Sequence, residues 1–316
     1  MSANSCQYVY GPVPSRRLGR SLGIDLVPFK TCSYDCVYCQ LGRTTNKTLE
    51  RKEYIPVAEV LDELERKLAS GENPDYISLA GSGEPTLNSG MGGLIRQIKT
   101  FTDIPVAVLT NGSLLWMPEV QDSLMKADLV LPSLDAGEER LFRYVNRPHK
   151  DIPFDRMVGG LVEFTGRFPG NVWLEVFLLA GVTGIPAEVK KIATLVKRIA
   201  PDRVQLNTVS RPPAEEFAHP LSMDQMRTLG DLFPGQVDII REDRENHPHP
   251  PVLSCIPDAD ILAILRRHPC TFRDIAECLG IHGTEALKRL DGLVTTGKIK
   301  TILLDKRIFY VVVEPG

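Results

Sequence analysis

The sequence predicts an α/β protein with a parallel sheet, followed by a smaller C-terminal domain. Six short apolar segments between residues 22 and 209 alternate with amphipathic helical patterns. Helical crossovers between successive strands favour right-handed βαβ units and therefore parallel pairing. A proline-rich stretch then separates this pattern from a different one near the C-terminus. Periodicity alone leaves open whether the sheet is doubly wound or forms a complete or partial (β/α) barrel.

The individual elements follow from the spacing of apolar residues. In the first helix, Val57, Val60, Leu61 and Leu64 recur at helical intervals with charged residues between them. The predicted helices span residues 57–68, 91–101, 117–126, 154–168 and 187–199. The predicted strands span residues 22–27, 76–80, 106–110, 129–134, 173–180 and 203–209.

A linker and a C-terminal domain are predicted after residue 240. Residues 241–257 include the run His-Pro-His-Pro-Pro, and proline is excluded from the interior of helices and sheets. Apolar spacing beyond it predicts three helices, and alternation around Asp305 and Lys306 predicts a β-hairpin. This order of elements resembles a winged helix-turn-helix. The predicted division is therefore a domain over 1–240, a linker over 241–257 and a small α+β domain over 258–316.

The composition is that of an ordinary globular chain with nearly balanced charge. Of 316 residues, 43% are apolar and 24% charged, and the formal net charge is -3. No overall basic field therefore attracts nucleic acid or anionic lipid. Basic and acidic side chains are nearly equal in number after residue 252, so that domain offers at most a local basic face. Without a secretion signal or a membrane-length apolar run, a cytoplasmic protein with no membrane partner is expected.

Three of the seven cysteines lie within eight residues, as Cys32, Cys36 and Cys39. This loop follows the first predicted strand, and in a reducing compartment such thiols favour metal or redox chemistry over disulfides. Soft thiolate ligands select zinc, copper(I) or an iron–sulfur cluster. Three ligands on a four-iron cube leave one iron open to an external ligand. The alternatives are a zinc site completed by Cys255 or a histidine, a Cys36–Cys39 redox pair, and buried structural thiols.

Small and polar residues follow the predicted strands. The carboxyl ends of parallel strands are where α/β folds bind their ligands, so these residues are candidates for one shared site. Each group alone is more often a turn or a cap than a ligand site. The candidates are Gly81, Ser82, Gly83, Glu84, Asn111, Ser133, Asp135 and Asn207.

The cysteine loop, the aromatic Tyr38 within it and the segment beginning at Gly81 resemble, in this order, the motifs of the radical S-adenosylmethionine (SAM) superfamily. Ser82 replaces a glycine of the family's Gly-Gly-Glu-Pro segment. The resemblance covers about residues 8–215 and implies a partial (β/α)₆ barrel. It also implies one [4Fe–4S] cluster held by Cys32, Cys36 and Cys39, with SAM as its further ligand.

The same resemblance implies roles for the other candidates. Gly81, Ser82, Gly83 and Glu84 would contact the methionine end of SAM, and Asn111, Ser133, Asp135 and Asn207 would contact SAM or substrate. A one-electron reductant such as ferredoxin or flavodoxin would split SAM into methionine and a 5′-deoxyadenosyl radical, which abstracts a substrate hydrogen atom. The cofactor supplies this chemistry, and the protein positions the substrate and excludes water and oxygen.

Longer phrases, such as Asn146-Arg147-Pro148, resemble a narrower group related to the wyosine-base tRNA enzymes. This favours an RNA base as substrate, with a peptide, a protein or a small metabolite as alternatives. The additional N-terminal cysteines of the wyosine enzymes are missing, because only Cys6 precedes the loop. A competing hypothesis of another class is a DNA-binding regulator that senses iron through the cysteine loop.

Four arginines are candidates for binding an anionic substrate group, because guanidinium forks match phosphates and carboxylates. Ion-paired surface positions are the alternative for each of them. They are Arg16, Arg17, Arg147 and Arg211.

Overall fold

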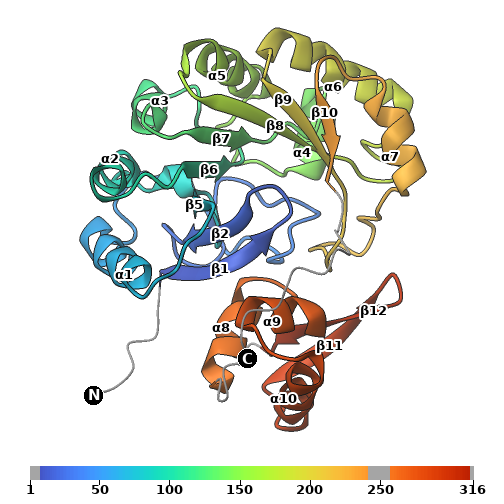
Figure 1. The fold of residues 1–316 in the computed structure, drawn as a ribbon. Helices are drawn as coiled ribbons and strands as arrows, with labels where there is room; N and C mark the ends of the chain where they lie inside the picture. The colour runs from blue at the N-terminus through green and yellow to red at the C-terminus, as the bar shows by residue number, and fades with distance from the viewer. Residues whose placement is uncertain (1–7, 241–256, 314–316) are drawn as a thin grey trace.

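An eight-stranded sheet organises the larger part of the chain (Figure 1). The structure is a computed structural model that describes residues 8–240 and 257–313. The strand order is β1 (Val9–Ser15), β2 (Gly19–Ile24), β5 (Tyr76–Leu79), β6 (Val106–Thr110), β7 (Leu129–Pro132), β8 (Asn171–Phe177), β9 (Arg203–Asn207) and β10 (Val237–Ile239). Only β1 pairs antiparallel, with β2, and the other neighbours pair in parallel. The predicted α/β class and its parallel sheet are confirmed.

Helices cover the sheet because each buries one apolar stripe. The first, α1 (Val57–Ala69), buries Val57, Val60, Leu61 and Leu64, as their spacing predicts. The others are α2 (Met91–Phe101), α3 (Pro118–Leu124), α4 (Glu139–Val145), α5 (Phe154–Arg167), α6 (Pro186–Ile199) and α7 (Met223–Gly230). The apolar faces of helices and sheet form one core. Among the described residues, no helix has both the length and the apolar character needed to cross a bilayer.

A short accessory sheet holds the segment between β2 and α1. Strand β3 (Thr31–Cys32) pairs with β4 (Asn46–Lys47) and also bridges to Gly83, beyond the end of β5. This pairing places the start of the cysteine loop beside the glycine-containing segment of residues 81–83. A one-turn helix, η1 (Pro85–Leu87), follows that segment.

The C-terminal residues build a second, smaller core. Three helices, α8 (Asp258–Arg267), α9 (Phe272–Leu279) and α10 (Gly283–Thr295), precede the hairpin of β11 (Ile299–Leu304) and β12 (Arg307–Val312). Thr271 and Asp274 form a capping box on α9. Asp305 and Lys306 both have positive φ, the geometry of a tight two-residue hairpin turn. The three helices and the hairpin are therefore confirmed as elements.

The C-terminal elements contact the larger sheet at several points (Figure 1). Arg267 of α8 forms a 3.2 Å ion pair with Asp25, just beyond β2. The Arg307 guanidinium donates to the Ser210 carbonyl at 3.1 Å. Leu304 packs with Val37 and its apolar neighbours. Residues 257–313 thus lie against the segments that follow β2 and β9.

Most of the predicted linker, residues 241–256, lies outside the described residues. Cys6, Cys255, His247 and His249 also fall outside them. The hypothesis of a zinc site completed by Cys255 therefore concerns a residue outside the part of the chain that the structure describes.

Candidate functional site

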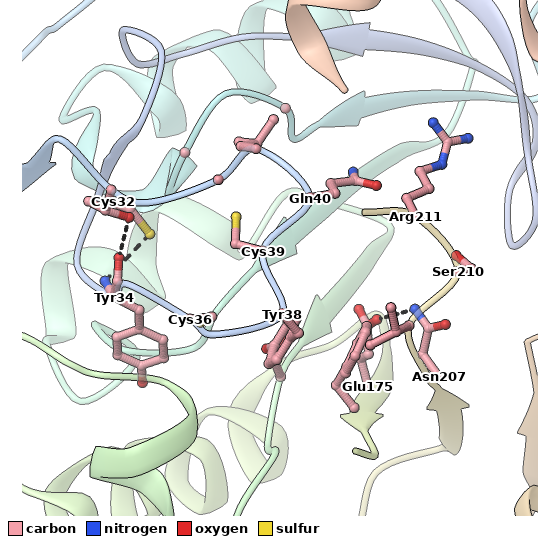
Figure 2. A pocket seen from close by; sticks show the side chains of 18 of the residues that line it. Cys32, Tyr34, Cys36, Tyr38, Cys39, Gln40, Glu175, Asn207, Ser210 and Arg211 are labelled. Atoms are coloured by element: carbon pink, nitrogen blue, oxygen red, sulfur yellow. Dashed lines mark hydrogen bonds between the residues drawn. The ribbon is translucent and has the colours of Figure 1, made fainter. Parts of the chain in front are cut away.

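The three cysteines of the loop line one cavity of about 270 Å³. Cys32 is the second residue of β3, and Cys36 and Cys39 lie on the turn that follows (Figure 2). All three are free thiols. Cys32, Cys36 and Cys39, which the sequence predicts to be ligands of one centre, therefore border the same cavity.

The loop is held in place by backbone hydrogen bonds to the end of α4. The Val37 amide donates to the Val145 carbonyl at 2.9 Å, and the Asp35 amide donates to the Asn146 carbonyl at 3.0 Å. Val37 is fully buried, so the loop has its own apolar anchor between Cys36 and Cys39. A loop fixed in this way presents its thiols in one orientation before any ligand binds.

Two side-chain amides face the cysteine sulfurs. Asn111 Nδ2 lies 3.5 Å from Cys32 Sγ, and Asn146 Nδ2 lies 3.5 Å from Cys36 Sγ. Burial raises the pKa of Cys32 to about 12 and that of Cys36 well above its usual value. Without a ligand these thiols therefore keep their protons at neutral pH, and a bound metal centre would supply the positive charge that stabilises thiolates.

The donor set fits an iron–sulfur cluster better than a single metal ion. Across residues 8–240 and 257–313, no three cysteine, histidine, aspartate or glutamate side chains converge closely enough to hold one ion. A four-iron cube is wider than a single ion, and three thiolates bordering one cavity match that larger group. The residues present therefore fit the [4Fe–4S] cluster that the sequence resemblance implies.

The segment that begins at Gly81 forms the part of the cavity wall next to Cys32. Gly81 has φ +108°, and a Cβ there would lie 2.0 Å from Asp25 Oδ1. A Cβ on Gly83 would lie 1.8 Å from the Thr31 carbonyl oxygen. Only glycine allows β3 and this segment to approach so closely. Gly81, Ser82 and Gly83 consequently line the cavity beside Cys32.

Glu84 lies behind this wall rather than among the residues that line the cavity. Its carboxylate accepts hydrogen bonds from the Thr86 amide at 3.0 Å, Thr110 Oγ1 at 2.7 Å and the Asn111 amide at 2.7 Å. Burial raises the pKa of Glu84, and these hydrogen bonds act against the rise. Glu84 therefore joins the glycine segment to the end of β6 and fixes Asn111 beneath Cys32.

Asp135 is a second buried carboxylate, and it holds the part of the cysteine loop that contains Tyr38. It accepts from the Tyr38 hydroxyl, from Asn146 Nδ2 at 2.6 Å and from the Phe177 amide at 3.0 Å. Burial raises its pKa to about 6. The Tyr38 ring stacks on Phe177 with centroids 3.9 Å apart, so Asp135 fixes the position of an aromatic face in the cavity wall.

The predicted strand-end residues thus separate into two groups. Ser133 and Asn207 line the cavity, whereas Asn111 and Asp135 support it from behind. Asn207 Nδ2 donates to Glu175 Oε1 at 2.9 Å. Figure 2 shows this pair near Tyr38, with Ser210 and Arg211 farther toward one side.

Several lining residues were not predicted as site residues. Phe177 stacks under Tyr38, and Thr208 and Ser210 follow Asn207 along the wall. The polar residues just after Asn207 were a usable signal, because they continue the segment beyond the carboxyl end of β9. The stacking of Phe177 on Tyr38 had no sequence signal, because alternation along β8 predicts the side of the sheet on which Phe177 lies but not the ring that it contacts.

Family and structural comparisons agree with this geometry. A model described as the Radical SAM superfamily matches residues 26–218. A radical SAM methyltransferase from Sphaerobacter thermophilus has a similar fold, with a TM-score of 0.52 and 19% identity, covering 69% of this chain and 66% of that one. At this identity the likeness concerns the fold alone.

Relatives of higher identity extend over nearly the whole chain. A UPF0026 protein of Methanocaldococcus jannaschii is 33% identical over 95% of this chain and 94% of its own length. A protein named GTPase Obg from Brachyspira hyodysenteriae is 42% identical over 96% of this chain. The chain spans only 45% of the length of that protein, so the name belongs to the longer protein as a whole. The chain belongs to the radical SAM superfamily, a class of enzymes that use a [4Fe–4S] cluster, SAM and an external electron donor.

Proposed function

We propose that Cys32, Cys36 and Cys39 hold one [4Fe–4S] cluster and that this chain cleaves SAM reductively at that position. The observation that carries the proposal is the position of three free thiols on one loop, around one cavity whose wall also includes Gly81, Ser82 and Gly83. The open side of the sheet, between β1 and β10, is consistent with the partial (β/α)₆ barrel that we propose for residues 1–240.

Held by Cys32, Cys36 and Cys39, the cluster would pass one external electron to SAM and so supply a 5′-deoxyadenosyl radical, with methionine released, for abstraction of a substrate hydrogen atom. The chain's own residues bind, orient and enclose these groups. We assign the electron donor to a small protein such as ferredoxin or flavodoxin.

The residue roles follow from which side chains reach the cavity. Gly81, Ser82 and Gly83 offer backbone groups to the methionine end of SAM, and Ser133 and Asn207 face SAM or substrate. Glu84, Asn111 and Asp135 act as positioning residues, because their polar atoms already bind the protein. This refines the sequence hypothesis, in which all three contact SAM or substrate directly.

For the substrate we propose a base in RNA, on the sequence resemblance to the wyosine-base enzymes. The helices and hairpin after residue 257 support the hypothesis of a winged helix-turn-helix domain, joined by a linker over 241–257. A peptide and a small metabolite are the alternatives. Transfer of deuterium from labelled RNA, peptide or metabolite pools into 5′-deoxyadenosine separates the three, and only the true substrate class transfers the label.

Anaerobic reconstitution with iron and sulfide tests the cofactor assignment. We expect about four irons per chain, the content of one cube, and dithionite-dependent release of 5′-deoxyadenosine. Cys32→Ala should lower the iron content and abolish this release, because only two thiolates remain.

Cys278→Ala is the matched control, since Cys278 lies on α9, outside the cavity. It should retain both the iron and the cleavage activity. Full cleavage activity in Cys32→Ala would contradict the assignment, as would equal losses in the two variants.

A further inference from the structure

Three arginines line one part of the cavity described above. Arg16 and Arg17 come from the turn between β1 and β2, and Arg211 follows β9. Figure 2 shows Arg211 and Ser210 on the opposite side of the cavity from Cys32, with Gln40 and Cys39 between them. Arg211 and Ser210 therefore lie apart from Cys32, and Arg16 donates a hydrogen bond to Ser210.

The charges of these arginines are not balanced by acids in the cavity wall. Glu175 is the one acidic residue among the described residues that line the cavity. Arg17 binds it with two hydrogen bonds, of 2.6 and 2.9 Å. This fork-to-carboxylate pair satisfies Glu175 and neutralises Arg17. Arg16 and Arg211 remain without a carboxylate partner in the cavity wall.

Arg211 is held mainly by neutral acceptors. Its NH1 donates to the Pro269 carbonyl at 2.9 Å and lies against His268 Nδ1. Burial, followed by the Arg211 charge, lowers the pKa of His268 to about 3, so this ring is neutral. The closest Asp274 oxygen is 3.9 Å away and also accepts from the Thr271 amide. These contacts fix the orientation of the Arg211 guanidinium, and its positive charge can still attract an anion in the cavity.

Arg16 has still less compensation. Its NH1 donates to Ser210 Oγ at 3.1 Å, and no carboxylate within residues 8–240 and 257–313 forms a salt bridge with it. The side chain remains accessible to solvent. The surrounding protein, and then the neighbouring charges of Arg17 and Arg211, lower the pKa of Arg16 to about 10, and the smaller effects of Glu175 and Asp274 act against this. Adjacent like charges of this kind are relieved when an anion binds between them.

The cofactors do not account for this excess of positive charge. A [4Fe–4S]²⁺ core with three thiolates has one net negative charge, and SAM bound to it through a neutral amino group has none, so together they bring a single negative charge into the cavity. Lys30 lies beside the glycine wall, where its backbone amide donates to the Ser82 carbonyl at 2.7 Å. Lys30 also lines the cavity, so its one positive charge is enough to offset the one negative charge of the cofactors. Arg16 and Arg211 therefore remain for the substrate.

We propose that Arg16 and Arg211 bind a phosphoryl group of the substrate, with Ser210 between them. Guanidinium forks match phosphate oxygens, and two cations that pair with no carboxylate of the cavity wall match a dianion better than a single carboxylate. The proposal rests on the proposed function for the position of SAM, and it applies equally to a small phosphomonoester and to a phosphate of RNA.

Calorimetric titration of the anaerobically reconstituted protein with inorganic phosphate tests the site. Arg16→Gln and Arg211→Gln should each raise the Kd for phosphate at least tenfold, and Arg16→Lys should fall between Arg16→Gln and the unmodified protein. Arg147→Gln is the matched control, because Arg147 pairs with Glu215 at 2.6 Å outside the cavity and should leave the Kd unchanged. Equal iron content and melting temperature show that each variant is folded.

Two further arms complete the test. Cytidine 5′-monophosphate and a short RNA without terminal phosphates distinguish the phosphate sources, and tight binding of either one that depends on Arg16 supports the site. Cys32→Ala protein should bind phosphate normally, which separates this site from the cluster assignment. An unchanged Kd in Arg16→Gln, competition between phosphate and SAM, or acetate binding as tight as that of phosphate would overturn the proposal.

Discussion

Asp135 shows how one buried carboxylate can organise a loop that carries cofactor ligands. It joins the Tyr38 hydroxyl, the Asn146 amide and the backbone of Phe177. Burial raises its pKa from 3.8 to about 6, although each of these hydrogen bonds favours the ionised form. The buried Asp135 carboxylate therefore lowers the stability of the fold when it is ionised. It also fixes the positions of Tyr38 and of the Asn146 side-chain amide that faces Cys36.

This cost predicts a pH-dependent stability. The folded state binds the Asp135 proton more tightly than the unfolded state, so this contribution to stability is complete below about pH 4 and is lost as pH rises through about 6. The shift corresponds to about 3 kcal/mol. Urea unfolding of the reduced, cluster-free protein should show the unmodified chain losing stability relative to Asp135→Asn between pH 4.5 and pH 7. Parallel pH profiles would contradict this interpretation.

Motif spacing predicts which residues gather at the site but not the direction of each side chain. Gly81, Ser133 and Asn207 line the cavity, whereas Glu84 and Asp135 bind the backbone behind it. All five lie near the carboxyl ends of parallel strands, which is what the sequence reveals. Whether a side chain at a strand end points into the cavity depends on the local turn, and one sequence does not contain that information.

The hairpin of β11 and β12 places two adjacent leucines in opposite environments. Leu303 is 72% exposed, whereas Leu304 packs in the cluster that includes Val37 and Val209. Val37 of the cysteine loop belongs to this cluster, so the hairpin packs against the apolar group that anchors the loop. Alternation along a strand produces this contrast between neighbours.

The contrast predicts different effects of the same substitution. Leu304→Ser should lower the free energy of unfolding by about 1 kcal/mol, because it removes part of an apolar contact. It should also accelerate bleaching of the cluster absorbance by oxygen. Leu303→Ser, the control, should change stability by less than about 0.5 kcal/mol. Equal bleaching rates in the two variants would exclude a protective role for the hairpin.

At the level of elements, strongly periodic segments were predicted well. Helix α2 and strand β6 have the predicted bounds, and α5 and α6 differ from prediction by one residue at one end. Strand β1 was missed because it contains Pro12 and Pro14, which are tolerated in an edge strand but weaken the sequence pattern. Helices α4 and α7 and strand β10 were missed: they are short, and the periodic signal in so few residues is weak, although α3 and α9 of the same lengths were predicted.

Across the whole molecule, Asp25 connects the C-terminal elements to the cavity wall. Its Oδ1 accepts from the Ser82 amide at 2.8 Å, and its Oδ2 faces Arg267 Nε at 3.2 Å. The Arg267 guanidinium also lies 4.4 Å from the centre of the Tyr10 ring. Both charged side chains are mostly buried, with exposed fractions of 15% and 9%. Their connection is therefore more than a surface ion pair.

Arg267→Ala should consequently destabilise the chain by about 3 kcal/mol, because Asp25 is left buried without its cation. Hydrogen exchange should accelerate at the Ser82 amide, which depends on Asp25. Arg266→Ala is the control, since Arg266 is the exposed neighbour on the same helix. Denaturant unfolding and exchange mass spectrometry measure both effects. Similar free energies of unfolding and similar exchange rates for the two variants would show that the Asp25–Arg267 ion pair does not stabilise the chain.

The order of the chain also has a consequence for assembly. The cysteine loop and the glycine segment both lie before residue 84, and their supports follow by residue 215. The hairpin that packs against the apolar cluster around Val37 follows all of these residues in the chain. We therefore expect that an iron–sulfur cluster can reach its ligands before residues 257–313 have docked, and that their docking encloses a site that is already loaded.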